Sequence, residues 1–364
     1  MTADRQPASL STLDDVRQRV DARLTSFLEE SATQLRDISP VADRLTEPLR
    51  AFAAGGKRVR AVLLWWGYEL AGGRDASAVA SAAGSVELLH AAALVHDDII
   101  DASETRRGSP AVHAHFRDHH RSAHLSGDAL LYGTSAAIIA GDLCLALSEQ
   151  LFDAGGFTLD AAARAAHAEL RRDVMLGQFL DVELQAARVP RAELRTRADE
   201  VLTHKTAKYT VVQPLVLGAA LAGASQSLRD GLTAFGLPLG RAFQMRDDVL
   251  GVFGDPRVTG KPAGDDLVQG KRTILVAEVL ERARPADADW FERRLGQPHM
   301  TEAEVDRMSS LIVDSGALAA FEDLIEQETG AALTALDALA EQGLASADVA
   351  TLRTFADALT DRRS

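Results

Sequence analysis

The stretch ASAVASAAGSVELLHAAALVHDDII, residues 76–100, shows what kind of fold this chain can adopt. It is rich in alanine and leucine and carries the spacing of a helix, so we predict one long helix here. Its residues are apolar on nearly every side, which is typical of a helix buried at the centre of a core. The same helix ends in the acidic pair Asp97 and Asp98, and that is unusual for a buried element.

Most of the remaining chain repeats the apolar spacing of a helix face, and alternating segments of strand length are hard to find. We therefore predict an all-α protein, a bundle of about ten or more helices of ordinary length. No linker rich in proline, glycine or serine divides the chain. The prediction is a flexible N-terminus over residues 1–12 and one all-α domain over residues 13–364.

Composition limits the classes of function. The formal net charge is −14, which argues against nucleic acid as a partner, because such binding needs a basic patch. A single cysteine, Cys144, allows no internal disulfide and suits a cytoplasmic protein. The first residues do not have the pattern of a signal peptide. Glycine, proline or charges are expected to break the apolar stretches short of a membrane span, so no stable membrane insertion is predicted.

Three aspartates lie close together at the end of the long helix. Asp97 and Asp101 are four residues apart and so share a helix face, with Asp98 rotated to one side. Such a cluster repels itself unless a counter-charge is present. Mg²⁺ with substrate phosphates would supply that charge. The alternative is a solvated helix end with three exposed acids, and the motif alone does not decide between them.

A second acidic pair, Asp247 and Asp248 in FQMRDD, ends another apolar helix. Two such helix ends facing one cavity could hold a diphosphate through bridging metal ions. The chain also contains basic residues of the kind that bind phosphate oxygens. These are Lys57, Arg58, Arg60, Arg106, Arg107, Lys205, Lys261 and Lys271. Any one of them taken alone would be a surface residue, but together with two acidic pairs they favour a diphosphate site.

The motifs GGKRVR, HDDIID followed by ETRRG, GQFLD, KTAKY, FQMRDD and GKPAGDDLVQGKRT resemble, in order and spacing, the trans-isoprenyl diphosphate synthases. The resemblance covers about residues 50 to 280, and is strongest to bacterial geranylgeranyl diphosphate synthases. It implies the isoprenoid synthase fold with a deep central cavity, and a homodimer. It further implies that isopentenyl diphosphate condenses with dimethylallyl, geranyl or farnesyl diphosphate, and that three Mg²⁺ ions bind per site, with Mn²⁺ able to substitute.

The resemblance also assigns roles to residues. The implied metal ligands are Asp97, Asp98, Asp101, Asp247 and Asp248. The allylic diphosphate would be held by Arg106, Lys205 and Lys261. Isopentenyl diphosphate would be held by Lys57, Arg60, His90 and Arg107. Lys271 is a further phosphate-binding candidate, and Gln178 and Asp181 complete the polar rim. Thr206 and Gln244 would point oxygen dipoles at the carbocation, with Tyr209 close by.

One residue departs from the family pattern, because Gly251 stands where the second motif usually has a third aspartate. We expect activity to survive, since the first aspartate matters most. His90, taken alone, would be a core histidine. The histidine-rich tract VHAHFRDHHRSAH reads as a loop, and a zinc site there is not expected. Cys144 lies in an apolar pattern and is expected to be an inert packed thiol.

Product length is expected to depend on Ala92 and Ala93, one turn before Asp97 on the same helix. The family blocks the chain here with bulky side chains, so two alanines imply an open floor and a C20 product, with Leu89 a turn deeper as a candidate floor. Farnesyl diphosphate and products of C25 and longer remain alternatives. A terpene cyclase or a non-catalytic partner subunit is a weaker alternative, since the basic residues for a second diphosphate and the first acidic motif are both present.

Overall fold

The structure is a computed structural model and describes residues 9–106, 108–255 and 262–361. Helices form nearly all of it, and the exception within these residues is a short hairpin of β1 (Thr105–Arg106) and β2 (Ser109–Pro110). The prediction of an all-α protein is therefore confirmed. The described chain divides into two compact units. We call Leu10–His167 with Pro214–Ser225 the N-terminal unit, and Ala168–Gln213 with Gln226–Ser364 the C-terminal unit.

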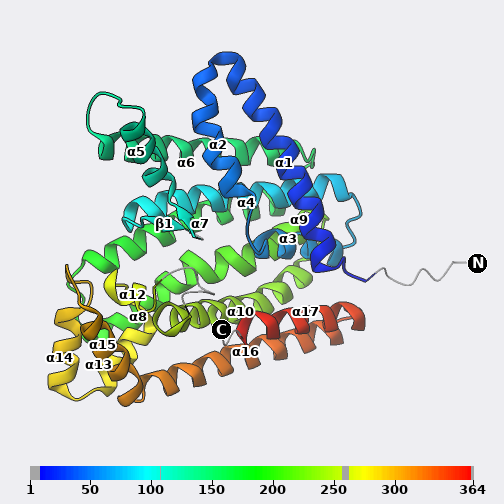
Figure 1. The fold of residues 1–364 in the computed structure, drawn as a ribbon. Coiled ribbons are helices and arrows are strands. Elements are labelled where there is room, and N and C mark those ends of the chain that lie inside the picture. Colours follow the sequence, from blue (N-terminus) through cyan, green and yellow to red (C-terminus); the bar gives the residue numbers. More distant parts are fainter. Residues whose placement is uncertain (1–8, 107, 256–261, 362–364) are drawn as a thin grey trace, which may run out of the picture. The chain divides into compact units, whose positions relative to one another are not determined.

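The helices of the N-terminal unit are coloured from blue to green in Figure 1. They are α1 (Leu13–Ile38), η1 (Pro40–Ala42), α2 (Asp43–Ala53), α3 (Val59–Leu70), α4 (Ala76–Ile100), α5 (Val112–Ser122) and α6 (Ala129–Asp153). Two helices belong partly to each unit, namely α7 (Ala161–Ala186) and α9 (Gln213–Leu221). The C-terminal unit is built from α8 (Arg191–Val201), the π-helix η2 (Leu202–Val212), α10 (Gln226–Phe253), α12 (Asp265–Val268), α13 (Ile274–Arg282), α14 (Pro285–Arg294), α15 (Glu302–Asp314), α16 (Ala317–Glu341) and α17 (Ser346–Thr360).

Helix α4 is the predicted central helix, and it packs most extensively against α6. Its N-terminus is capped by Asp75, whose side chain accepts hydrogen bonds from the backbone N–H groups of the first turn. In its first half, the buried side of α6 consists of small residues, which let the neighbouring helices α4 and α5 approach closely. These are Gly133, Ala137, Ala140, Gly141 and Cys144. The small side chains of α6 thus allow the apolar helix α4 to be buried.

Helices α4 and α6 are both long and apolar enough to cross a membrane, judged by length and hydropathy. The expectation that every apolar stretch falls short of a span is therefore wrong for these two helices. For α4 the reason is its burial, since 89% of its most apolar window lies inside the protein. For α6 only 33% of that window is buried. The exposed apolar face of α6 is therefore a feature that burial does not explain.

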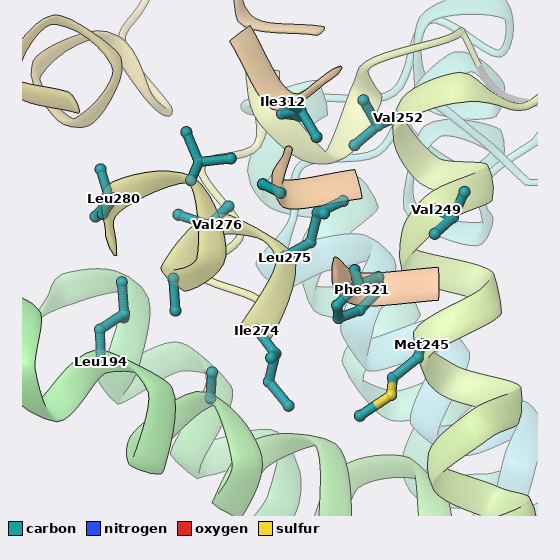
Figure 2. Close-up of a cluster of buried hydrophobic side chains, with 14 of the residues drawn as sticks. Leu194, Met245, Val249, Val252, Ile274, Leu275, Val276, Leu280, Ile312 and Phe321 are labelled. Carbon is teal, nitrogen blue, oxygen red and sulfur yellow. The ribbon is translucent and has the colours of Figure 1, made fainter. Parts of the chain in front are cut away.

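The core of the C-terminal unit forms where α10 meets η2, α13 and α16 (Figure 2). Met245 and Val249 of α10, Leu275 of α13 and Phe321 of α16 point into one buried apolar cluster. The segment after residue 285 thus supplies helices that cover the helix bearing the second aspartate pair. Arg246 of that helix donates to the backbone carbonyl of Thr360 and pairs with Glu322 at 2.7 Å.

Two expectations from the sequence need correction. The histidine-rich tract is the helix α5, because its apolar residues and two of its histidines, His113 and His120, are buried on one face. The N-terminus is held from Leu10 onward, since Leu10 is buried and the Ser11 carbonyl accepts a hydrogen bond from Trp66 Nε1. Residues 1–8 lie outside the described part, and the single domain over residues 13–364 stays a prediction.

Candidate active site

The first aspartate motif occupies the last turn of α4, in the N-terminal unit. Asp98 is fully buried and accepts a hydrogen bond from Arg106 Nε at 2.8 Å, with a second contact from the same guanidinium. Asp97 is half-buried, and its Oδ2 lies 3.7 Å from Arg106 Nη2. Asp101 is half-buried at the C-cap position. The sequence prediction grouped Asp98 with the metal ligands, whereas its closest partner here is an arginine.

The hairpin of β1 and β2 brings Arg106 back onto α4. Gly108 in its turn has φ 76°, in the left-handed region that glycine adopts without strain. Before the hairpin, Glu104 pairs with Arg117 of α5 at 2.7 Å, and this ion pair lowers the pKa of Glu104. The acidic neighbourhood raises the pKa of Arg106 although burial opposes this, so its guanidinium stays charged. Arg107 lies outside the described residues.

The basic loop GGKRVR leads into α3 in the same unit. Lys57 is exposed, and Arg60 is half-buried in the first turn of α3. His90 lies on α4 and is half-buried. Arg58 behaves differently, because it is only 6% exposed and pairs with Asp21 at 2.7 Å and Glu87 at 3.3 Å. The prediction that Arg58 is a phosphate-binding cation is therefore corrected: its charge is used inside the protein.

The second aspartate motif lies near the end of α10, in the C-terminal unit. Asp247 is exposed, whereas Asp248 is buried and accepts a hydrogen bond from Gln244 Nε2 at 2.7 Å. Burial raises the pKa of Asp248 well above its ordinary value, and the carboxylates of Asp266 and Asp247 add to this while Gln244 opposes it. The amide of Gln244 thus donates to a carboxylate here, and its proposed role toward a carbocation stays a prediction.

Gly251, one turn beyond Asp247, has a physical reason to be glycine. A Cβ atom at this position would lie 2.0 Å from Asp266 Oδ2. Asp266 belongs to the GKPAGDDLVQGKRT motif and pairs with Lys271 at 3.0 Å. A carboxylate from another segment therefore occupies the space next to α10 where the family's third aspartate would begin. Lys261 of the same motif lies outside the described residues.

The KTAKY motif forms part of the π-helix η2, a rare element that is often found at functional sites. Lys205 Nζ contacts Asp181 Oδ2 at 2.6 Å, so these two predicted residues are brought together. The wide backbone of η2 fits between two glycines. A Cβ atom at Gly177 would lie 2.4 Å from the Lys205 backbone, and one at Gly240 would lie 2.6 Å from the Ala207 carbonyl oxygen.

The remaining predicted residues also lie on these elements. Thr206 and Gln178 are half-buried in η2 and α7, and Tyr209 is buried in η2. Among the product-length candidates, Ala92, Ala93 and Leu89 are all buried in α4. Ala92 packs with Ala137, Ala140 and Cys144 of α6. Burial raises the pKa of the Cys144 thiol to about 12, in accord with an inert packed cysteine.

The predicted residues fall into two groups, one in each unit. The N-terminal unit holds Lys57, Arg60, His90, Arg106, Asp97, Asp98 and Asp101. The C-terminal unit holds Gln178, Asp181, Lys205, Thr206, Tyr209, Gln244, Asp247, Asp248 and Lys271. Each group combines carboxylates with cations, and their joint use of one substrate pair stays a prediction. Sequence reasoning did not single out Glu87 or Asp266. Glu87 had a signal, because it is the one residue of Asp, Glu, Lys or Arg type in residues 76–95.

The carboxylates at the acidic helix end of each unit are donors of the kind that a hard divalent cation shares with phosphates. Asp97, Asp101 and Asp247 offer carboxylate oxygens that are not fully buried. Within residues 9–106, 108–255 and 262–361, no three side chains of His, Cys, Asp or Glu form a group that could hold a metal ion by themselves. Mg²⁺ typically binds one or two carboxylates and completes its coordination with substrate phosphates and water. Each acidic helix end, taken by itself, therefore has ligands of the kind that Mg²⁺ shares with a diphosphate.

Comparison with known proteins agrees with this chemistry. Residues 42–312 match the Polyprenyl synthetase family. A crystal structure of geranylgeranyl pyrophosphate synthase from Corynebacterium glutamicum, complexed with isoprenyl diphosphate and magnesium, is 39% identical; the match covers 97% of this chain and all of that one, with a TM-score of 0.89. The geranylfarnesyl diphosphate synthase of Aeropyrum pernix is 36% identical over 76% of this chain and 81% of its own.

A third relative extends the range of product lengths. The (2E,6E)-farnesyl diphosphate synthase of Mycobacterium bovis is 33% identical over 72% of this chain and 68% of its own length. The three relatives are thus named for products of three different lengths. The structural likeness also confirms the predicted isoprenoid synthase fold. The family match and these identities show that the chain belongs to the polyprenyl synthetase family.

Proposed function

We propose that this prenyltransferase condenses isopentenyl diphosphate with an allylic diphosphate to form all-trans geranylgeranyl diphosphate, releasing diphosphate. The observation that carries the proposal is the end of α4. There, Asp97 and Asp101 are half-buried, and the charge of Asp98 is matched by Arg106. A helix end of this kind presents carboxylates to a cation and keeps a guanidinium beside them for phosphate oxygens. Two substrates with diphosphate groups match the two sets of basic residues.

In the proposed mechanism, Asp97, Asp101 and Asp247 would hold Mg²⁺, with Asp248 in support. When bound, Mg²⁺ neutralises the diphosphate and makes it a better leaving group. Arg106 and Lys205 hold the allylic diphosphate, and Lys57, Arg60 and His90 hold isopentenyl diphosphate. The allylic C–O bond breaks, the double bond of isopentenyl diphosphate attacks the resulting cation, and a proton is lost to the departing diphosphate. The mechanism requires that water be excluded from the reacting cation, which it would otherwise hydrolyse. Three metal ions per site, and replacement by Mn²⁺, belong to the same proposal.

The C20 product follows from the small side chains of Ala92 and Ala93. Each isoprene unit requires about 5 Å, roughly one helical turn, of further depth. In this proposal the growing chain passes the two alanines one turn before Asp97, of which Ala92 lies beside the small residues of α6, and it meets Leu89 about one turn nearer the start of α4. We expect Ala92→Phe to shorten the product to farnesyl diphosphate. An unchanged product from this variant would mean that position 92 does not face the growing chain.

A homodimer is supported by the apolar face of α6. Leu131, Ile138 and Ile139 are 67%, 44% and 56% exposed in the single chain. Contiguous exposed apolar surface of this kind marks interaction sites, and a second copy of the same chain is the commonest partner. Light scattering after gel filtration tests this, because Ile138→Lys should produce monomers from a dimeric parent. The acidic chain with one buried thiol also accords with a cytoplasmic location.

The function is tested by incubating the purified protein with labelled isopentenyl diphosphate, Mg²⁺ and each allylic primer. Sizing of the dephosphorylated alcohols should give mainly the C20 alcohol, whereas mainly C15 or C25 alcohol would assign the alternative product. Release of diphosphate should require both substrates. A terpene cyclase would release it from the allylic substrate alone and form hydrocarbons, and a non-catalytic subunit would release none.

A further inference from the structure

We propose that Arg58 and Glu87 are positioning residues that fix the cations for isopentenyl diphosphate in place relative to α4. The inference rests on the proposed function, in which Lys57, Arg60 and His90 bind that substrate. It goes further by assigning a task to two buried charges that touch no substrate. The inference is carried by one contact: Arg58 of the basic loop is paired with Glu87 of the central helix α4.

Arg58 uses its guanidinium entirely inside the protein. Its Nε donates to Asp21 Oδ1 of α1 at 2.7 Å, and Nη1 lies 3.3 Å from Glu87 Oε2 of α4. Nη2 donates to the carbonyl oxygen of Ala53, at the end of α2. One side chain therefore joins three helices to the basic loop. The guanidinium spreads its donors over three nitrogen atoms in one plane, whereas lysine has a single nitrogen that could not reach all three partners in this geometry.

Glu87 also holds the first turn of α3, into which the loop leads. Its Oε1 accepts a hydrogen bond from the backbone N–H of Ala61 at 3.2 Å, while Oε2 pairs with Arg58. Ala61 directly follows Arg60, and Arg58 directly follows Lys57. The carboxylate of Glu87 thus binds the residue that follows Lys57 and the residue that follows Arg60, the two predicted cations for isopentenyl diphosphate. Glu87 is 8% exposed, and it has no other charged residue of Asp, Glu, Lys or Arg type near it in α4.

The backbone of the loop is also constrained. Arg58 has φ 52°, in the left-handed region that a residue with a Cβ atom seldom adopts. Arg17 of α1 donates from Nε to the carbonyl oxygen of Lys57 at 2.9 Å. Arg17 and Asp21 are one turn apart on the same face of α1, so this helix contacts two successive loop residues. Contacts to α1 and α4 therefore hold the loop in a conformation that it would not adopt alone.

The arrangement has a consequence for the geometry of binding. His90 lies three residues after Glu87, about one turn further along the same helix. The helix that holds Arg58 therefore also carries a predicted ligand for the same substrate, and its last turn contains Asp97. A buried ion pair contributes little net stability, because desolvating both charges offsets their attraction. Its role here is to set the position of Lys57 and Arg60 relative to His90 and the aspartates.

Two variants separate positioning from stability. Glu87→Gln keeps an oxygen acceptor for the Ala61 N–H but leaves Arg58 without its buried counter-charge. Arg58→Met combined with Glu87→Gln removes both charges, so no buried ion is left without its partner and the unfolding temperature should return toward that of the parent. Glu278→Gln is the matched control, because Glu278 is also a buried carboxylate held by arginines, Arg195 and Arg282, in the C-terminal unit.

The measurements are KM for isopentenyl diphosphate, KM for farnesyl diphosphate and the unfolding temperature of each full-length variant. We expect both Glu87 variants to raise KM for isopentenyl diphosphate about tenfold, with KM for farnesyl diphosphate changing less than twofold. The double variant should show the raised KM for isopentenyl diphosphate although its stability is recovered. Glu278→Gln should change neither KM. If KM for isopentenyl diphosphate follows the unfolding temperature, or if both KM values rise together, the inference is overturned and the ion pair is structural.

A separate pair of variants tests the assignment on which the inference depends. Lys57→Ala and Arg60→Ala should each raise KM for isopentenyl diphosphate by more than tenfold. If these two variants leave that KM unchanged, the proposed binding roles are wrong and the inference is overturned with them. If they raise it and Glu87→Gln does not, the binding roles stand and only the positioning role of Arg58 and Glu87 is overturned.

Discussion

The two aspartate pairs of this chain look alike in sequence but are built differently. In both pairs, the first aspartate is more exposed to solvent and the second is buried. At the end of α4, buried Asp98 is matched by the charged guanidinium of Arg106. Near the end of α10, buried Asp248 is matched by the neutral amide of Gln244, and the nearby Asp266 and Asp247 raise its pKa. One buried aspartate is thus paired with a charged guanidinium, and the other accepts from a neutral amide.

This difference suggests different roles for the aspartate pair of α4 and the aspartate pair of α10. Because Asp98 is buried and already accepts from Arg106, we expect its main role to be the orientation of that guanidinium. Around Asp248, the carboxylates of Asp266 and Asp247 raise its pKa more than Lys271 lowers it, so binding of a cation would relieve their repulsion. The second pair should therefore respond more strongly to Mg²⁺, and the first should respond more strongly to loss of its arginine.

The largest effect should come from the open aspartates, where the two pairs ought to behave alike. Asp97→Asn and Asp247→Asn should each lower kcat by about two to three orders of magnitude, because each removes a charge that holds Mg²⁺ on the diphosphate. Diphosphate release under saturating substrates measures this. Asp37→Asn, at an exposed position of α1, is the control and should retain full activity. Full activity in either site variant would exclude that aspartate from the metal site.

The buried aspartates should differ in stability. Asp98→Asn leaves the guanidinium of Arg106 without its buried counter-charge and should lower the free energy of unfolding by about 3–5 kcal/mol. Asp248→Asn replaces a carboxyl group that is already costly in its charged form and should change it by less than about 1 kcal/mol. Urea denaturation of the metal-free proteins compares the two. Equal losses would show that the two pairs are built alike.

Magnesium should sharpen the contrast. A ligand at one hundred times its Kd stabilises the folded state by about 2.7 kcal/mol, which appears as a higher unfolding temperature. With Mg²⁺ and inorganic diphosphate, the parent should show such a rise. Asp247→Asn should lose nearly all of it, and Asp248→Asn should lose part of it. Thermal denaturation with and without a chelator measures these shifts, and an unchanged rise in Asp247→Asn would contradict the assignment.

The smallest effect concerns Gly251. Gly251→Asp restores the residue type usual in the family, yet its Cβ atom would meet the Asp266 carboxylate. We expect a loss of about 1–2 kcal/mol in stability and a modest loss of activity. Gly251→Asp combined with Asp266→Gly relieves the overlap and should recover the stability of the parent. A stable Gly251→Asp single variant with raised activity would show that Asp266 moves aside freely.

The sequence predicted the helices and the residues of the site because both leave local signals. The apolar run of α4 and the acidic ends at Asp97 and Asp247 are visible in single segments. Helix α5 was missed because histidines occupy some positions of its buried face, so the apolar spacing around Phe116 is not evident in the sequence. The π-helix η2 was missed because it has no propensity signal of its own. It depends on the close approach of Gly177 and Gly240, which are far from it in the sequence.

The partners of the buried charges could not be predicted for a similar reason. Arg58 and Arg106 have the same sequence signature as phosphate-binding arginines, and only the fold shows which carboxylate each one meets. Asp98 likewise has the same immediate motif as Asp248, yet a hairpin eight residues on supplies it with an arginine. Contacts between residues of different elements depend on the packing of whole helices, and a local pattern does not contain that information.

Helix α4 finally limits how the chain can change in length. Glu87 and Asp98 are eleven residues apart, which is close to three full turns and about 16 Å along the helix axis. Inserting or deleting one residue between them would rotate one carboxylate by about 100° relative to the other. Arg58 and Arg106 could then no longer be held at the same time. An insertion or deletion in α4 is therefore tolerated only if it leaves Glu87 and Asp98 eleven residues apart.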